Sequence, residues 1–145
     1  MAATTPAIGL GSTIELAAAG VSPTWATLGF VTNINGPQEA VQLLETTHML
    51  STQKEFIPGV PDGGSITVEA NYAADHATHN ASTGVLYFER NRLACQIRIT
   101  PVGATNATSR EVWQVWVEKV DRSFPVDGVQ KLSVTFKLTG SPVVG

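Results

Sequence analysis

The feature that most constrains the fold is an alternation of apolar and polar residues, which recurs along most of the chain. It is sharpest over 130–139, where Leu132, Val134 and Phe136 are separated by polar residues. Successive side chains of a β-strand point to opposite faces of a sheet, so this pattern is typical of half-buried strands. Similar segments are 12–18, 25–34, 39–46, 65–72, 93–100 and 111–120. A strong turn signal at 35–37 predicts that 25–34 and 39–46 pair as an antiparallel hairpin, and 121–128 is expected to turn the chain. About seven strands predict a mainly β fold, an antiparallel β-sandwich or partly opened barrel.

One segment has a helical period instead. Residues 76–90 follow Asp75, whose side chain is suited to cap a helix start. Ala77, Val85 and Phe88 fall on one side of such a helix. We therefore expect one α-helix over 76–90, flanking the sheet.

A long connection, 47–64, separates two of the predicted strands. Connections without secondary structure that exceed about 12–15 residues are uncommon in compact domains. This one is rich in turn residues, yet it is too apolar for a solvated tether. We expect it to be a long inter-strand loop that contacts another copy of the protein. The residues predicted for this inter-subunit interface are Met49, Leu50, Phe56, Ile57, Pro58 and Val60.

The length of 145 residues suits one domain. We place this β-sandwich domain at 12–139, with an N-terminal arm over 1–11 and a C-terminal arm over 140–145. Residues 1–11 lack the charged start and apolar block of a secretory signal, so we expect synthesis and assembly in the cytoplasm.

The composition excludes several classes of protein. Charged residues make up 14% of the chain against about 25% in an average protein, and the net charge is −3. Without a basic excess, tight nucleic-acid binding is disfavoured. The chain has no apolar run of about 18 residues, so we expect no membrane partner. A surface with few charges suits a protein that is covered in an assembly.

No catalytic or cofactor-binding pattern is present in the sequence. It has no phosphate-binding glycine loop, nucleophile elbow or zinc-protease motif. We therefore expect that the protein is not an enzyme and that it has no cofactor. His76 and His79 have a spacing that could offer two metal nitrogens, but no third ligand is near, so a solvated or capping role is favoured. Cys95, in an alternating segment, is interpreted as a buried apolar residue.

Several short motifs occur in an order that points to a family. A strand ends at Glu45-Thr46-Thr47, and Leu50-Ser51-Thr52 follows. Ile57-Pro58-Gly59-Val60-Pro61-Asp62-Gly63-Gly64 precedes a strand that ends at Asn71-Tyr72, and Thr139-Gly140 closes the pattern. In this order and spacing the chain resembles the major tail tube protein of long-tailed bacteriophages, over most of its length.

This resemblance implies a structural virion protein, located in the tail and assembled in the host cytoplasm. It implies self-assembly into hexameric rings that stack as a tube, the conduit for DNA ejection. Implied partners are other copies, the tape measure, the tail terminator and baseplate components, while DNA passes through the lumen without tight binding. Glu39, Glu45 and Glu69 are the candidates for acidic groups that face the lumen, and the alternative is that they only keep a sheet surface soluble.

A different class of protein would share the same strand pattern. A monomeric β-sandwich binding module, such as a carbohydrate-binding or capsid-decoration domain, would use an exposed Trp25 or Trp116 to stack on its ligand. Such a module stays monomeric, whereas a tube subunit polymerises.

Overall fold

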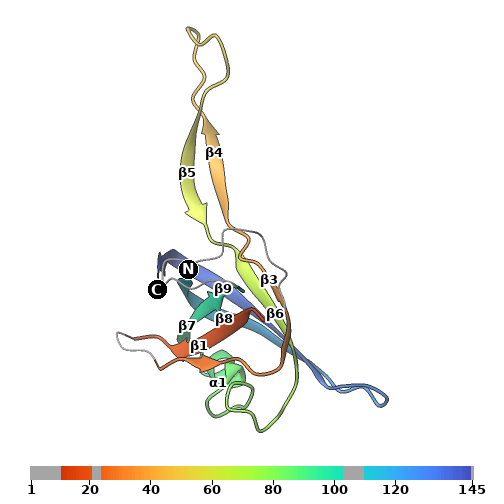
Figure 1. Ribbon diagram of the computed structural model, residues 1–145. Coiled ribbons are helices and arrows are strands. Elements are labelled where there is room, and N and C mark those ends of the chain that lie inside the picture. Colours follow the sequence, from red (N-terminus) through yellow and green to blue (C-terminus); the bar gives the residue numbers. More distant parts are fainter. Residues whose placement is uncertain (1–10, 21–23, 103–109, 145) are drawn as a thin grey trace.

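The computed structural model describes residues 11–20, 24–102 and 110–144, and within them a seven-stranded antiparallel sheet in the order β2-β1-β7-β8-β9-β6-β3. Two further strands, β4 and β5, form a separate two-stranded sheet that projects from the body (Figure 1). The elements are β1 (Thr13–Ala18), β2 (Ala26–Thr27), β3 (Val31–Asn35), β4 (Ala40–Glu45), β5 (Phe56–Asp62), β6 (Ser65–Asn71), α1 (Val85–Arg90), β7 (Ala94–Thr100), β8 (Glu111–Ser123) and β9 (Lys131–Val144).

The sheet curls around a single core. Side chains from β1, β6, β7, β8, β9 and α1 all belong to one buried cluster. Phe136, Ile66 and Ile97 lie fully buried in it, and each occupies an apolar position of its alternating strand. The sheet does not close, because its edge strands β2 and β3 do not pair with each other. An opening of about 530 Å³ is lined by β3 and by residues at the adjacent ends of β1 and β7. The predicted mainly β, sandwich-like and partly opened architecture is therefore confirmed.

The helix is much shorter than the predicted span 76–90. It begins at Val85, after Gly84 as N-cap, and Asp75 does not cap it. Asn80 stops an earlier start, because its Oδ1 accepts from the backbone N–H groups of Ser82 and Thr83 at 3.1 and 2.8 Å. Such side-chain bonds hold the backbone in turns in place of a helix.

The strand pairing also differs from the simplest expectation. Residues 25–34 do not form one strand that pairs with 39–46, because a turn at 29–30 separates β2 from β3, which pairs with β6. The predicted loop 47–64 contains β5, which pairs with β4 despite Pro58 and Pro61. The proposed N-terminal arm 1–11 lies outside the described residues except at Gly11. The proposed C-terminal arm 140–145 instead continues β9 as far as Val144, opposite β8.

Candidate assembly surface

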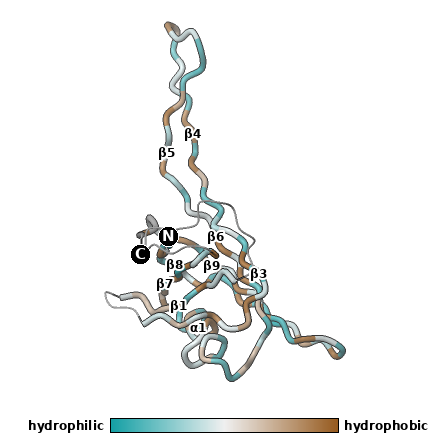
Figure 2. The backbone as a smooth tube through the Cα atoms, in the orientation of Figure 1, coloured by the Kyte–Doolittle hydropathy of each residue, from teal (hydrophilic) through white to brown (hydrophobic). Residues whose placement is uncertain are grey.

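The β4–β5 hairpin stands away from the core. In Figure 1 it extends from one end of the sheet, and Figure 2 shows hydrophobic stretches along its length. Every residue of β4 is exposed, as are all residues of β5 except Gly59. The six residues predicted for the interface all lie on this hairpin, and all are exposed: Met49, Leu50, Phe56, Ile57, Pro58 and Val60.

Both faces of the hairpin carry apolar side chains. Leu43 is opposite Pro58 on one face, whereas the next pair, Leu44 and Ile57, is on the other. Each of these three large side chains, Leu43, Leu44 and Ile57, exposes between 44% and 62% of its surface. A ribbon that only lay on one surface would need a single apolar face, so this hairpin is suited to contacts on two sides.

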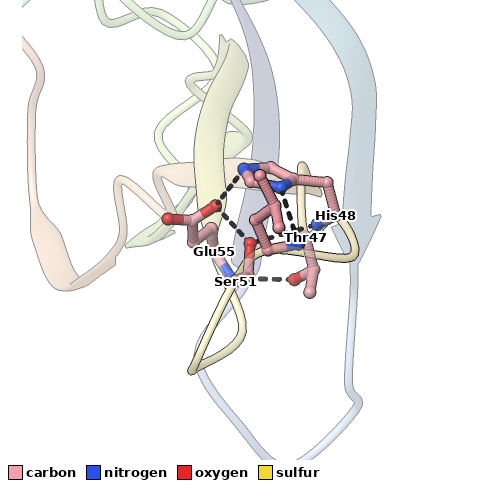
Figure 3. Close-up of polar contacts among 5 residues, drawn as sticks. Thr47, His48, Ser51 and Glu55 are labelled. Atoms are coloured by element: carbon pink, nitrogen blue, oxygen red, sulfur yellow. Dashed lines mark hydrogen bonds and ion pairs between the residues drawn. The ribbon is translucent and has the colours of Figure 1, made fainter.

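The tip of the hairpin is shaped by a local polar network (Figure 3). Ser51 donates to Glu55 Oε2 at 2.8 Å, and the Glu55 backbone N–H donates to Thr47 Oγ1 at 2.8 Å. His48 Nε2 lies 3.6 Å from the same Glu55 oxygen, and its Nδ1 accepts from the Leu50 N–H at 3.2 Å. Met49 and Leu50 are left 102% and 88% exposed. The network thus presents two large apolar side chains to solvent.

The base of the hairpin is tied to the sheet. Asp62 Oδ1 accepts from the Gly64 backbone N–H at 2.9 Å and from Lys137 Nζ at 3.4 Å. The Gly64 hydrogen bond and then the Lys137 charge hold the pKa of Asp62 below its usual value. Gly64 has φ +72, and its carbonyl accepts from the Leu138 N–H at 3.1 Å. These bonds fix the point at which the hairpin leaves the body.

A second projection is the end of the β8–β9 hairpin, visible at the lower right of Figure 1. It exposes Phe124, Val126 and Val129, with Val126 98% exposed. Sequence reasoning placed a turn at this position and missed its apolar surface. The signal was present, since an ordinary solvated turn contains few large apolar residues.

The three acidic candidates do not come together within one subunit. Glu39 and Glu45 lie near opposite ends of β4, whereas Glu69 lies on β6 of the main sheet. All three are exposed. Glu69 is on the polar face of β6, opposite Ser133 of β9. The β9 side of this face also carries Lys131 and Lys137, so the face is polar and of mixed charge.

Of the pair His76 and His79, expected to be solvated or capping, His79 differs because it is buried, and both side chains form hydrogen bonds within the fold. His79 is fully buried, and its Nε2 donates to the Gly29 carbonyl at 2.8 Å while its Nδ1 accepts from the Ala73 N–H at 3.1 Å. Burial lowers the pKa of His79 below the ordinary histidine value. His76 Nδ1 lies 2.8 Å from Thr78 Oγ1. Within the described ranges, no group of three or more potential metal ligands occurs.

Two further sequence interpretations can be compared with the structure. Cys95 is fully buried, as expected, and burial raises the pKa of its thiol to about 12. One face of the Trp25 ring is covered, because the Arg98 guanidinium lies 4.6 Å from its ring centroid. Trp116 is 46% exposed. None of the described helices is long and apolar enough to span a membrane.

Several solved structures have folds similar to that of this chain. No protein-family model and no curated protein matches the sequence. The chain superposes on a subunit of the SPP1 tail tube with a TM-score of 0.70 and 13% identity, covering 93% of this chain and 77% of that one. The chain has a tail tube fold. A subunit of the tail of an empty gene transfer agent particle gives a TM-score of 0.74 at 12% identity, with 97% and 99% coverage.

The tail tube fold extends to another type of particle. A subunit in the sheath/tube terminator structure of PVC, an extracellular contractile injection system, gives a TM-score of 0.61 at 12% identity, with 97% and 98% coverage. At these identities the likeness concerns the fold, and it confirms at that level the resemblance identified from the sequence motifs.

The structure exposes three apolar residues of β4 that the sequence analysis did not assign to an interaction surface. Val41, Leu43 and Leu44 of β4 were expected to belong to a strand of the main sheet, but they are exposed on the hairpin. Three large apolar residues within four positions of a strand indicate apolar faces on both sides. The sequence contains this signal, but the expected pairing of 39–46 with 25–34 favoured a position in the main sheet.

Proposed function

We propose that this chain is a structural subunit that polymerises into the tail tube of a phage-like particle, as hexameric rings that stack into a conduit for DNA. The observation that carries the proposal is the β4–β5 hairpin, an element with apolar side chains on both faces and no core of its own. Exposed apolar surface of this extent marks an interaction site. The likeness to the SPP1 tail tube supports the identity of the assembly.

Unpaired strand edges support self-association. Among the described strands, β3 pairs only with β6, and β4 and β5 pair only with each other. An unpaired edge offers backbone N–H and C=O groups to a strand of another molecule. When the rotation between neighbours closes, such contacts generate a ring, and a second contact along the axis stacks the rings.

The polar face that carries Glu69 supports a wall around a DNA conduit. Its charges are mixed, with Glu69 on β6, the paired Lys119 and Asp121 on β8, and Lys131 and Lys137 on β9. A mixed polar face has little net attraction for a polyanion, and the chain as a whole carries a charge of −3. We propose that Glu69 faces the lumen, and that Glu39 and Glu45 add negative charge where hairpins of neighbouring subunits meet.

Partners and location follow from the same proposal. A tube of this kind ends at other tail proteins, so the tape measure, the tail terminator and baseplate components are the proposed partners, and the virion tail is the proposed location. A structural role without catalysis agrees with the internal hydrogen bonds of both histidines and the burial of Cys95.

Negative-stain microscopy of concentrated protein tests this function directly, with hollow tubes of six-fold symmetry as the expected result. The double substitution Leu44→Ser and Ile57→Ser removes the apolar pair from one face of the hairpin and should abolish the tubes. Because both side chains lie outside the core, the urea midpoint should not change. The control is Leu93→Ser, a similarly exposed residue away from the hairpin. Monomers at every concentration of the wild-type protein would contradict the proposal.

The proposed lumen position of Glu69 has its own test. Glu69→Lys should convert tubes that do not retain DNA into tubes that do, because six added cations would line each ring. The control is Glu89→Lys on α1, which lies outside the sheet. Equal DNA retention by both variants would exclude Glu69 from the lumen.

A further inference from the structure

A hollow lies at the base of the β4–β5 hairpin, where the hairpin meets the main sheet. It has a volume of about 690 Å³. Its apolar wall comes from both the hairpin and the core strands: Val41, Val60, Pro61, Trp113 and Leu138. A space of this size with an apolar wall is large enough for several side chains.

The hollow contains a residue with an unsatisfied polar atom. Trp113 is only 6% exposed, and its indole Nε1 is buried without a hydrogen-bond partner among the described residues. A buried donor without an acceptor costs about 1–3 kcal/mol and is uncommon in native proteins. Because this nitrogen has almost no accessible surface, an occupant of the hollow would contact other atoms of Trp113, and the hollow is defined by its apolar wall.

The charges around the hollow select among possible occupants. Glu39 and Asp62 line it, and although Asp62 is paired with Lys137, Glu39 forms no ion pair within the described chain. An occupant that carries an apolar group and a cation is therefore favoured. The tip of the β8–β9 hairpin is disfavoured as the occupant, because the carboxylate of Asp127 follows its exposed Val126.

We propose that the hollow receives the hairpin tip of a second copy of this chain, with Met49 and Leu50 against its apolar wall and Lys54 beside Glu39. Met49 and Leu50 are the exposed apolar side chains of the tip. Lys54 is exposed and forms no ion pair within the described residues, whereas the neighbouring Glu55 is held by Ser51 and His48. The tip therefore offers a free positive charge next to two apolar groups.

One molecule cannot fill its own hollow. Ala40 lines the hollow, and the nine steps from Ala40 to Met49 would span about 30 Å in an extended chain. Figure 1 shows the hairpin extended, with its tip at the end remote from the sheet. Tip and hollow are different surfaces, so the contact is head-to-tail and repeats from copy to copy. The inference rests on the proposed function, for which it identifies the receiving surface.

Charge reversal tests the contact. Lys54→Glu and Glu39→Lys should each raise the protein concentration needed for assembly about five-fold or more, because each places like charges together. The double variant should return to within about two-fold of wild type, since the pair is restored in reverse. Single variants that assemble like wild type, or a double variant as poor as the worse single one, would overturn the inference.

Cross-linking tests it independently of tube formation. Leu50→Cys protein mixed with Val41→Cys protein and a short bis-maleimide should give a mixed dimer, identified by mass spectrometry. Cys95 is buried with its pKa raised to about 12, so it should not react and can remain. The control pair is Val126→Cys with Val41→Cys, which should give little mixed dimer. Equal yields from both pairs, or no mixed dimer from the first, would overturn the docking.

The two proposals fail in different ways. Wild-type tubes with neither charge coupling nor the mixed dimer would leave the proposed function in place and remove only this receiving site. A mixed dimer and charge coupling in short oligomers, without tubes, would support the docking and contradict the tail tube function.

Discussion

Arg98 on β7 donates hydrogen bonds to both carboxylate oxygens of Glu15 on the neighbouring strand β1, at 3.3 Å from Nε and 2.5 Å from Nη2. The two side chains are only 16% and 17% exposed, and the guanidinium also lies over the Trp25 ring. Two-point binding of a carboxylate by arginine is the strongest geometry for such a pair. The contact therefore ties the segment that contains Trp25 to the sheet.

Glu15→Gln should lower the free energy of unfolding by about 1.5–3 kcal/mol, the range for a hydrogen bond to a charged group. The loss arises because Arg98 stays largely buried without its counter-charge. Urea denaturation of the subunit measures it. The matched control is Asp121→Asn, which breaks the exposed Lys119–Asp121 pair and should cost under about 1 kcal/mol. Equal losses in the two variants would contradict this assignment.

Gly64→Ala should destabilise the subunit by about 2 kcal/mol, because φ is +72 and an added Cβ would strike the backbone carbonyl of Gln38. Gly20→Ala is the control, since nothing lies within 4 Å of its Cβ position. That variant should stay within about 0.5 kcal/mol of wild type. The urea midpoints of the two variants provide the comparison, and a Gly64 variant as stable as the control would be inconsistent with the structure.

Acidification should weaken the subunit through His79. Its pKa is lowered in the folded state, mainly by burial, so the unfolded chain takes up the proton first. The stability that neutral His79 provides is fully present above the unfolded value of about 6.5 and is lost as pH falls through the folded pKa. The urea midpoint of wild type should drop between pH 7.5 and pH 5. His79→Asn lacks the titrating group and should show a smaller drop, and an identical drop would exclude His79 as its source.

Backbone amides of the isolated subunit should fall into two groups with different hydrogen-exchange rates. A two-stranded hairpin alone is marginally stable in water, and β4 and β5 have no other hydrogen-bonded strand. Their amides should therefore exchange much faster than those of β6, β8 and β9, which surround the core. Assembly should slow exchange in the hairpin most. Slow exchange over 40–62 in a verified monomer would mean that the hairpin has support that the structure does not show.

The main sheet was predictable because its signal is local. Segment 65–72 alternates cleanly, and β6 covers 65–71 with Ile66 and Val68 buried. The same holds for β9, whose apolar positions Leu132 and Phe136 enter the core. Burial on one face of a sheet imposes period two on the sequence itself, so the pattern is sufficient to find these strands.

The hairpin and the helix were not predictable in the same way. β5 contains Pro58 and Pro61, which normally argue against a strand, but a two-stranded sheet has only edges and tolerates them. The apolar period over 76–90 suggested a long helix, yet the hydrogen bonds of Asn80 and His79 hold turns instead. Pairing and side-chain bonding between distant segments decide these cases, and a single sequence does not display them.

The two prolines of β5 have a consequence for the free subunit. Neither has a backbone N–H, so two of the seven residues of β5 lack the donor that a strand residue normally offers to a neighbouring strand. A strand from another protein can therefore pair with β5 over only part of its length, which limits amyloid-like growth of the free subunit. Side-chain contacts then contribute more to recognition, and they can distinguish another copy of this chain from an unrelated protein.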